Sequence, residues 1–363
     1  MPSRRGLLGA GLAFCSCCLL DRARAQPAHQ QAPARRPVSI GGQRVKTVDV
    51  HSHCIFQDAL SLMGAAGQNI VPPTKGVAEH FLANGVDDRL RSMDDMGVDM
   101  EILSINPFWY RTDRDTGSRI VALQNDHLAE LCAANPDRFG AFASLTMQFP
   151  DLAVKQLEDA MRKPGIRGAA IGGSVLGESF AEPRFRPLLA KAEELGAVLF
   201  IHPQALPEMA PRFVGNGWIA NTVGNPLETT IALEHLIFEG ALDRFPKLKI
   251  LAAHGGGFLP SYAPRIDVSC SVSPQNCNPG IVLKKKPTEY LNQMFYDALV
   301  FTPEALRHLA AQVGTSQIVL GTDFPIPWEL HPVDLVLATP SLSDPERVAI
   351  LGGNAARLFG LPA

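Results

Sequence analysis

Short apolar runs, many of them rich in β-branched residues, recur along the chain from Val45 onward. The runs are continuous rather than alternating with polar residues, which is typical of strands buried on both faces of a parallel sheet. Between them lie stretches in which apolar residues return every three or four positions, as on one face of a helix. The eight runs cover residues 47–50, 101–105, 140–145, 167–171, 197–201, 248–252, 294–300 and 317–320.

Proline marks the beginning of several of the predicted helices. Its fixed backbone suits the first helical turn, and Pro183, Pro226 and Pro303 stand where such a turn would begin. Eight strand–helix alternations predict a single α/β domain, a (β/α)8 TIM-like barrel, over residues 45–363. The competing architecture is a doubly wound open sheet, which usually has fewer strands and a glycine-rich phosphate turn. No such turn follows an early run, so nucleotide binding is disfavoured.

The first 25 residues have the pattern of an export signal. Arg4 and Arg5 precede an apolar stretch, residues 6–20, that is too short to span a bilayer. Ala23 and Ala25 supply the small residues that a signal peptidase recognises, and paired arginines are typical of the twin-arginine route. Residues 26–44 follow as a predicted linker, a short N-terminal extension of the barrel. We expect a periplasmic protein, with a cytoplasmic one as the alternative.

The composition limits the classes of protein and of partner. The 363 residues are 46% hydrophobic and 19% charged, which excludes a disordered chain, and seven cysteines exclude a disulfide-packed miniprotein. The 33 Lys and Arg nearly balance the 36 Asp and Glu, so we expect no nucleic-acid partner. Beyond the predicted signal no stretch reaches about 18 apolar residues, so we expect no membrane span in the mature protein.

Polar residues with metal-binding chemistry stand at the ends of four predicted strands. His51 and His53 end the first strand, and alternation along a strand sends both imidazoles to the same side. His202 ends the fifth run, His254 follows the sixth and Asp323 follows the eighth. Because the carboxyl ends of barrel strands meet at one face, these side chains are expected to converge. Imidazole and carboxylate ligands, with one position left for water, suit a catalytic divalent ion such as Zn²⁺.

Each of these histidines also has a structural interpretation, because buried polar groups in a core are commonly hydrogen-bonded for packing reasons alone. Four His and one Asp at four strand ends favour a metal site over such a polar cluster. The remaining histidines divide differently: His127, His235 and His308 fall within predicted helices and are expected at the surface or in packing. His80 and His331 fall in loops of the active face and stay open as further site members.

Five motifs are specific in combination. They read Val-Asp-Val-His-Ser-His at 48–53, Ile-His-Pro at 201–203, Ala-His-Gly-Gly-Gly at 253–257, Leu-Gly-Thr-Asp-Phe-Pro at 320–325 and Ile-Leu-Gly-Gly-Asn-Ala at 350–355. Together they resemble the amidohydrolase superfamily, and within it the branch that contains aminocarboxymuconate-semialdehyde decarboxylase. The resemblance covers nearly all of the chain beyond the predicted signal.

The resemblance implies roles for individual residues. His51, His53, His202 and Asp323 would bind one zinc ion, while His254 and Asp323 would act in acid/base catalysis. In family decarboxylases an Arg eleven residues after the catalytic His holds a substrate carboxylate, often across the interface of a homodimer. That position is Arg265, for which the alternative is a residue on a helix surface.

The chain also departs from the family pattern. Gln204 stands where the decarboxylases often carry Trp, and a second carboxylate-binding Arg from the first loop has no clear counterpart, Lys75 being the residue considered. Superfamily members with two metals bridge them through a carboxylated Lys at the end of the fourth strand. This chain has Ile-Gly-Gly-Ser at 171–174, so one metal ion is expected.

Three hypotheses for function follow. The first is a zinc-dependent, non-oxidative decarboxylase of a small unsaturated or aromatic carboxylic acid. The second uses the same mononuclear site to add water, as a lactone or amide hydrolase or as a hydratase. The third is an exported metal-binding module without catalysis, which an acid/base pair beside the ion argues against. Trp109, Tyr110 and Trp218 fall in predicted active-face loops, where they either stack on a flat substrate or pack the loops.

Export bears on the substrate and on the cysteines. Aminocarboxymuconate chemistry belongs to cytoplasmic tryptophan breakdown, so an exported enzyme is expected to act on another acid. Cleavage after Ala25 would remove three cysteines together with four Arg and one Asp, moving the formal net charge from −3 to −6. Cys270 and Cys277 can pair in an oxidising compartment, and Cys54 is expected to point away from the metal.

Overall fold

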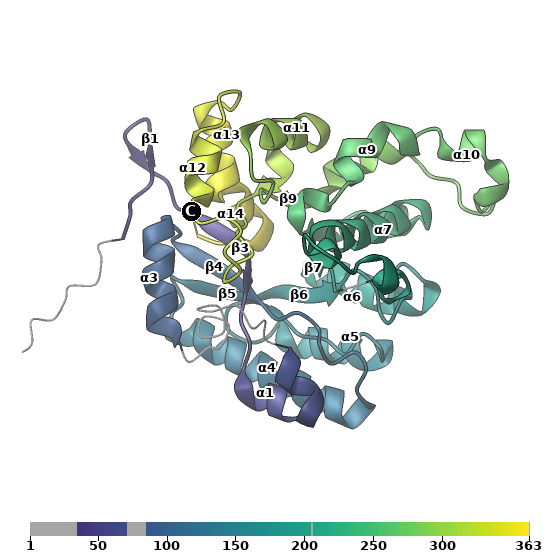
Figure 1. Ribbon diagram of the computed structural model, residues 1–363, viewed down its shortest axis with the longest axis horizontal. Helices are drawn as coiled ribbons and strands as arrows, with labels where there is room; N and C mark the ends of the chain where they lie inside the picture. Colours follow the sequence, from purple (N-terminus) through teal and green to yellow (C-terminus); the bar gives the residue numbers. More distant parts are fainter. Residues whose placement is uncertain (1–34, 71–84, 205, 363) are drawn as a thin grey trace, which may run out of the picture. The chain divides into compact units, whose positions relative to one another are not determined.

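The computed structural model describes residues 35–70, 85–204 and 206–362. The predicted signal, residues 1–25, and the first part of the predicted linker lie outside the described residues, as do Lys75 and His80. The described part contains a small antiparallel hairpin and one large domain of parallel strands and helices (Figure 1).

An eight-stranded parallel sheet forms the centre of the domain, and each strand pairs with the next one along the chain. Its strands are β3 (Val48–His53), β4 (Met100–Ser104), β5 (Phe139–Ala143), β6 (Ile166–Gly172), β7 (Val198–His202), β8 (Lys249–Ala252), β9 (Met294–Asp297) and β10 (Ile318–Val319). Backbone bonds from Val50 N to Leu320 O (2.9 Å) and from Asp323 N to His51 O (2.8 Å) join the two edges. The predicted TIM-like barrel and all eight strands are confirmed, with bounds shifted by up to three residues.

Helices connect the strands and cover the outside of the barrel (Figure 1). Pro226 and Pro303 lie in the first turns of α7 and α11, as predicted, and Pro183 begins a 3-10 turn that leads into α6. The helices are α1 (Gln57–Ser61), α3 (Val86–Met96), α4 (Arg114–Ala134), α5 (Pro150–Ala160), α6 (Arg186–Leu195), α7 (Asn225–Phe238), α8 (Ala241–Arg244), α9 (Leu259–Ile266), α10 (Ser269–Val272), α11 (Pro303–Val313), α12 (Pro332–Leu337), α13 (Asp344–Val348) and α14 (Asn354–Phe359).

The end of the segment predicted as a linker, residues 26–44, is attached to the barrel. Within it β1 (Ser39–Ile40) and β2 (Gln43–Arg44) form an antiparallel hairpin. Val38 and Val45 on either side of the hairpin are buried in the large apolar cluster of the domain. Arg44 also donates a hydrogen bond to Asp99 Oδ1 at 2.6 Å. The composition of 26–44 did not indicate this attachment, because it depends on single valines rather than on a periodic pattern.

The strands separate two apolar clusters, which explains their continuous apolar sequence. The larger cluster lies between the strands and the surrounding helices. The smaller one fills the barrel interior, where Phe142 stacks on Phe200 with ring centroids 5.2 Å apart. Leu358 and Phe359 of α14 belong to this interior cluster and close one end of it. Side chains therefore fill the barrel interior, as in other barrels of this type. The expected place for an active site is the end of the barrel at which the strands have their carboxyl ends.

A change of register in β3 allows one strand to serve both the core and the site. Val48 and Val50 belong to the interior cluster. Strict alternation would then turn His51 and His53 away from the interior. The pairing of β3 with β4 instead shifts register between Asp49 and Ser52, so the two histidines also face inward. Cys54 packs in the outer cluster and also lines the cavity beside His53, so its orientation away from the metal stays a prediction.

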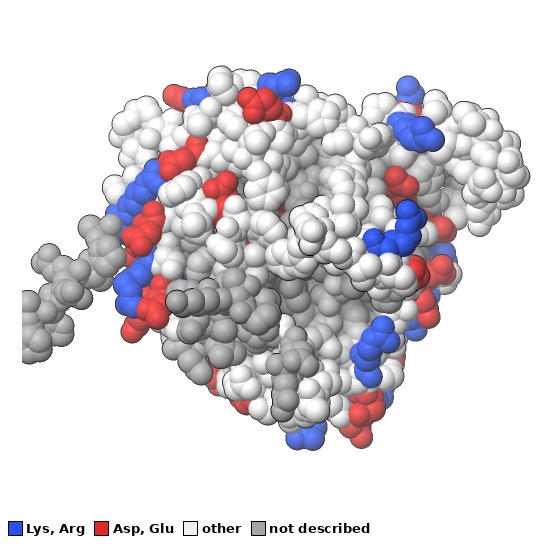
Figure 2. Space-filling view, in the orientation of Figure 1, with Lys and Arg blue, Asp and Glu red and all other residues white. Residues whose placement is uncertain are grey.

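The segment that carries α9 and α10 extends outward from the barrel, at the right of Figure 1. Cys270 and Cys277 form a disulfide there, so the pairing that the sequence left open is present. The other two cysteines of the described residues, Cys54 and Cys132, are free and buried. Among the described helices none is long and apolar enough to cross a membrane. Charged side chains of both signs lie together towards the edges of the face in Figure 2.

A buried ion pair fixes the strand that carries the first two site histidines. Arg89 of α3 contacts Glu101 of β4, with Nε 2.6 Å from Oε2, and both side chains are almost completely buried. The same guanidinium donates to the backbone oxygen of His53 at 2.7 Å and to the hydroxyl of Ser52. Arg89 thereby joins the end of β3 to β4 and to α3.

We predict that Arg89→Met strongly destabilises the fold. The substitution keeps the length of the side chain but leaves the Glu101 carboxylate buried without its partner, which costs about 3–5 kcal/mol. The free energy of unfolding, measured by chemical denaturation, should fall by that amount. Arg91→Met, which removes an exposed ion pair to Asp88 on the same helix, is the matched control and should cost less than about 1 kcal/mol. Equal stabilities of the two variants would contradict the role given to Arg89.

Candidate metal centre

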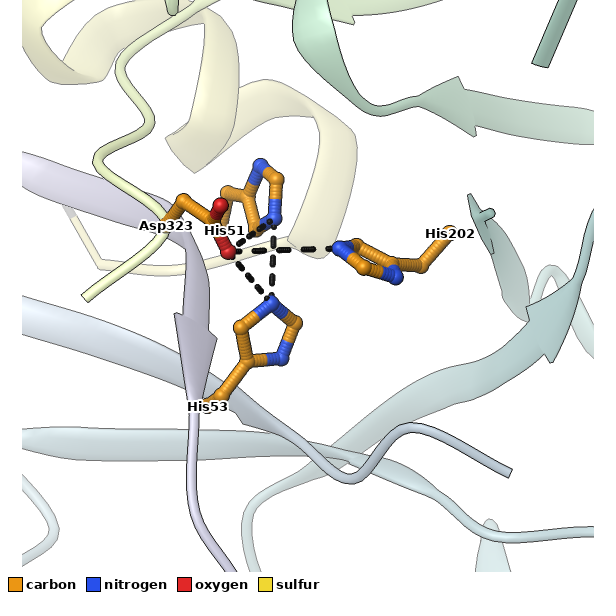
Figure 3. Close-up of side chains that lie close together, drawn as sticks. All are labelled: His51, His53, His202 and Asp323. Atoms are coloured by element: carbon orange, nitrogen blue, oxygen red, sulfur yellow. Dashed lines mark hydrogen bonds and ion pairs between the residues drawn. The ribbon is translucent and has the colours of Figure 1, made fainter. Parts of the chain in front are cut away.

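The four predicted ligands converge in the structure, each from the end of a strand (Figure 3). One ligand atom from each of His51, His53, His202 and Asp323 lies within 4.8 Å of all the others, and all four residues are buried. Asp323 Oδ1 is 2.8 Å from His53 Nε2, 3.2 Å from His51 Nε2 and 3.9 Å from His202 Nε2. Among the described residues this is the one group found with metal-binding geometry, which agrees with the prediction of a single ion.

The outer nitrogen of each imidazole has an acceptor, and this orients the inner nitrogen. Asp297 Oδ2 lies 2.6 Å from Nδ1 of His51, Ser104 Oγ 2.8 Å from Nδ1 of His53, and Pro203 O 2.9 Å from Nδ1 of His202. The hydroxyl of Ser104 also lies 3.1 Å from Ser52 O, to which it donates its proton, so it accepts from His53. Each Nδ1 therefore carries the proton, and each Nε2 lone pair points inward, as in metal-binding histidines.

Two observations show that the four residues fit a cation. The Nε2 atoms of His51 and His53 are only 3.2 Å apart, and lone pairs at that distance repel each other unless a positive charge lies between them. His202 Nε2 is buried and has no hydrogen-bond partner in the described part of the chain. A buried polar atom left unpaired is costly, so a ligand is expected at this position. Three imidazoles and one carboxylate suit a first-row divalent metal.

The electrostatics of the cluster also favour a bound cation. Burial would raise the pKa of Asp323, but His51, His254 and His53 lower the pKa of that carboxyl well below its usual range. Burial lowers the pKa of His202 well below its ordinary value, with His53 and His51 adding to the effect. At His51 the opposing effect of Asp323 and Asp297 exceeds that of burial and raises the pKa to about 10. The two carboxylates thus favour positive charge at His51, which a bound cation would supply in place of a proton.

Asp297 is a site residue that the sequence analysis missed. Its carboxylate accepts from His51 Nδ1 through Oδ2, from the backbone N of His254 at 2.9 Å and from the backbone N of Gly255 at 2.8 Å. It stands at the end of β9, the seventh strand of the barrel, and is completely buried. The rule that found the other residues, a polar side chain at a strand end, also selects Asp297, the one charged residue of run 294–300.

His254 lies beside the cluster rather than within it. It begins the short turn η6 (His254–Gly256), and its Nε2 is 3.7 Å from Asp323 Oδ2. The two carboxylate oxygens of Asp323 therefore face different partners, Oδ1 the ligand nitrogens and Oδ2 His254. This is the predicted position beside the metal ligands, and the acid/base role of His254 stays a prediction.

The other predicted residues are spread more widely. Arg265 lies on the exposed face of α9 and does not line the cavity beside the cluster. Trp109 is buried and donates from Nε1 to Leu145 O at 2.9 Å, so it packs a loop, and Tyr110 is buried with its hydroxyl bonded to Gly172 N. His331 is exposed before α12. His127, His235 and His308 lie in α4, α7 and α11, as predicted.

A cavity of about 240 Å³, which we call the metal-side cavity, opens beside the cluster. His53, His202 and Asp323 form its polar wall. Its remaining described lining includes the amide side chains of Asn106, Gln204, Asn221 and Asn225 together with the aromatic rings of Phe108 and Trp218. Gln204 is held by its backbone N, which donates to Glu228 Oε2 at 2.6 Å. A small flat molecule that binds here meets the metal ligands on one side and amide groups on the other.

We predict that Asp297→Asn weakens metal binding without removing a ligand. The amide has the same shape but no charge to hold the Nδ1 proton of His51, and loss of such a partner typically costs about 10–100-fold in metal affinity. Competition with a chromophoric chelator measures this affinity for Zn²⁺ and Mn²⁺. Asp151→Asn, which removes an exposed carboxylate paired with Arg114, is the control. An unchanged affinity for both metals in Asp297→Asn would show that the carboxylate does not support the site.

Comparison with known proteins places this geometry in a family. Residues 48–361 match the amidohydrolase family. The chain is 33% identical over 280 residues to 2-amino-3-carboxymuconate-6-semialdehyde decarboxylase of Dictyostelium discoideum, covering 76% of each chain. It is 32% identical over 295 residues to gamma-resorcylate decarboxylase of Rhizobium sp. (strain MTP-10005), covering 78% of this chain and 89% of that one.

Solved structures agree with the sequence relatives. A 2,6-dihydroxybenzoate decarboxylase in complex with 2,6-dihydroxybenzoate is 30% identical, with a TM-score of 0.77, over 87% of this chain and 100% of that one. A dihydroxybenzoic acid decarboxylase from Polaromonas sp. JS666, with bound manganese and the inhibitor 2-nitroresorcinol, is 28% identical, with a TM-score of 0.76, over 87% of this chain and 97% of that one. The chain belongs to the amidohydrolase family and is a metal-dependent carboxy-lyase or hydrolase of that superfamily.

Proposed function

We propose that the protein is a zinc-dependent, non-oxidative decarboxylase of a small aromatic or unsaturated carboxylic acid. The observation that carries this proposal is that the two carboxylate oxygens of Asp323 face different partners. One oxygen of its carboxylate belongs to the metal cluster, and the other lies 3.7 Å from Nε2 of His254 beside the metal-side cavity. A residue in this position can hold a proton next to a substrate that is bound at the metal. The sequence relatives and the structures of higher identity are decarboxylases of such acids.

The chain's own residues account for the proton that the reaction needs. Decarboxylation breaks a carbon–carbon bond, CO₂ leaves, and the electron pair that stays on the ring carbon accepts a proton. Because the lowered pKa of Asp323 keeps it ionised, it must first take up a proton, and Nε2 of His254 is placed to supply it. Oδ2 of Asp323 then delivers that proton to carbon. A divalent cation held by the four ligands would polarise a substrate oxygen next to the departing carboxylate.

The water-adding alternative uses the same residues in a different order. A lactone or amide hydrolase, or a hydratase, would use His254 or Asp323 to take a proton from water instead of giving one to carbon. The relatives by sequence described above are decarboxylases, and this favours loss of CO₂ over addition of water.

We propose Zn²⁺ as the metal because three imidazoles and one carboxylate form a donor set typical of catalytic zinc. Manganese is the competing ion, since the decarboxylase from Polaromonas sp. JS666 carries it. Elemental analysis of the protein purified without added metal, followed by activity after reloading with each ion, distinguishes the two. Higher activity with Mn²⁺ than with Zn²⁺ would replace zinc in the proposal and leave the reaction unchanged.

We further propose that the protein is exported to the periplasm through the twin-arginine signal in residues 1–25. The disulfide between Cys270 and Cys277 supports this, because disulfides persist in oxidising compartments and are rare in the cytoplasm. Fractionation of cells that express the full chain tests the location. Cytoplasmic protein that keeps residues 1–25 would contradict it.

We predict that Asp323→Asn and His254→Ala lose activity in different ways. Asp323→Asn removes the proton donor and a ligand, so turnover should fall at least about 100-fold. His254→Ala should also lose turnover but keep one bound metal per chain. The assay measures CO₂ release from 2,6-dihydroxybenzoate, muconate-type acids and other aromatic acids, with acid release from lactones measured in parallel.

His331→Ala is the matched control for His254→Ala, because His331 is an exposed histidine away from the cluster. Loss of metal in His254→Ala would make His254 a ligand. Substantial activity in Asp323→Asn, or acid release from lactones with no CO₂ from any acid, would refute the decarboxylase proposal.

We also propose a homodimer in which Arg265 reaches the substrate carboxylate of the partner subunit. Its exposed position on α9, away from the cavity of its own chain, supports such a role. Arg265→Ala should raise KM about ten- to hundredfold, since a hydrogen bond to a charged group is lost. The exposed Arg307→Ala on α11 is the control.

Subunit mixing tests the position of Arg265 directly. Arg265→Ala subunits mixed with inactive His202→Ala subunits should regain activity, because one site of the mixed dimer then contains both residues. Sedimentation as a monomer, or no recovery on mixing, would place Arg265 outside the site.

A further inference from the structure

A second cavity adjoins the metal-side cavity. It measures about 360 Å³, and we call it the aromatic annex. Its apolar wall consists of Phe258, Leu299, Val300, Phe301 and Trp328. These residues come from the segment before α9, from the loop after β9 and from the loop before α12 (Figure 1).

The annex adjoins the site at two places. Asn221 and Asn225 line both cavities. His254 lines the annex and Asp323 lines the metal-side cavity, and these two side chains face each other at 3.7 Å. The metal-side cavity alone, about 240 Å³, is smaller than typical small-molecule sites of roughly 300–1,000 Å³. With the annex, the available space falls within that range.

Two aromatic residues around the annex adopt a backbone conformation that such side chains normally avoid. Phe301 has φ 67° and Trp218 has φ 49°, both in the left-handed region. The two residues are 52% and 54% exposed, so burial gives little compensation for this conformation. Trp218 stacks on Trp328 with ring centroids 5.4 Å apart, and Phe301 meets Trp328 edge-on at 6.4 Å. Trp218 lines the metal-side cavity and Phe301 lines the annex, and both rings contact Trp328. Strained, exposed aromatic rings beside two adjoining cavities indicate a binding role, since stability alone does not favour them.

The chemistry of the walls indicates what the annex binds. None of the described residues that line the two cavities is Lys or Arg, so these residues offer no counter-ion to a second anionic group. The apolar rings and aliphatic side chains of the annex favour an uncharged hydrocarbon group. An acid with one carboxylate at the metal would direct such a group away from Asp323 and past His254.

We propose that the aromatic annex binds an apolar ring substituent, so that the preferred substrates are monocarboxylic aromatic acids with an alkyl chain of several carbons. This inference rests on the decarboxylase function proposed above and defines its substrate class. Phe301 and Trp328 then determine specificity by contacting the substituent, while Asp323 and His254 act at the carboxylate.

The test compares 2,6-dihydroxybenzoate with its methyl and propyl derivatives, substituted at ring position 3 in one series and at position 4 in another. Each buried methylene contributes about fourfold to binding. In one of the two series, kcat/KM should therefore rise at least tenfold from the unsubstituted acid to the propyl derivative. No rise in either series would overturn the inference.

Variants separate binding from structural packing. Phe301→Gly should lower the ratio of kcat/KM for the propyl derivative to that for the unsubstituted acid at least fivefold. Its thermal unfolding midpoint should not fall, because glycine adopts φ 67° without strain. Leu176→Gly, which relieves a left-handed backbone at φ 57° outside the annex, is the matched control and should keep the wild-type ratio. Trp328→Ala gives an independent reading of the same ratio. An unchanged ratio in Phe301→Gly and in Trp328→Ala would assign these rings to packing and overturn the inference.

A binding measurement distinguishes failure of the inference from failure of the proposed function. Calorimetry of the metal-loaded enzyme with resorcinol, 4-propylresorcinol and 5-propylresorcinol, the phenols that correspond to the unsubstituted acid and to the two series, requires no turnover. Tighter binding of one propyl compound than of resorcinol, lost in Phe301→Gly, would support the annex even if no acid released CO₂. Release of CO₂ at equal efficiency from all the acids, with equal affinity for the three phenols, would reject the annex and leave the decarboxylase proposal standing.

Discussion

A single buried carboxylate, that of Asp297, joins the parts of the chain that form the site. It accepts hydrogen bonds from the imidazole of His51, from the backbone of His254 and Gly255, and from the backbone N of Leu299 at 3.2 Å. A fully buried anion is costly unless several donors satisfy it, and these donors meet that need. Burial would raise the pKa of Asp297, but the contacts with His51 lower it, so the carboxylate stays charged. The candidate metal ligand His51 on β3 and the backbone of His254 after β8 are thus oriented by the same two oxygens.

The fold and the four ligands could be predicted from the sequence because both depend on local patterns. Continuous apolar runs predicted the strands, and strand ends located His51, His53, His202 and Asp323. Other features depend on contacts between distant segments, which no local pattern records. The Arg89–Glu101 pair is one example, and the attachment of 39–44 through Val38 and Val45 is another. Asp297 is intermediate between predictable and unpredictable features. Its position at a strand end can be read from the sequence, but its hydrogen bonds to His51, His254 and Gly255 are seen only in the structure.

Backbone strain is concentrated around the site. In the described part of the chain five non-glycine residues have left-handed backbones: Leu176, Trp218, His254, Phe301 and Asp323. All five line the metal-side cavity, the aromatic annex or a neighbouring hollow of the same face. Each such residue costs about 1–3 kcal/mol and persists only where the surrounding structure enforces it.

The register shift in β3 has a consequence for how this barrel tolerates change. Before the shift the strand places Val48 and Val50 in the apolar interior, and after it the strand places His51 and His53 in the site. The inward-facing positions therefore change from even-numbered residues before the shift to odd-numbered residues after it. The first set fills the barrel, and the second set belongs to the candidate metal site. A substitution that repacks the lower half changes volume there without rotating the histidines above it. The shift thus allows the residues that fill the interior to change without changing the orientation of His51 and His53. The two halves of the first strand can diverge independently.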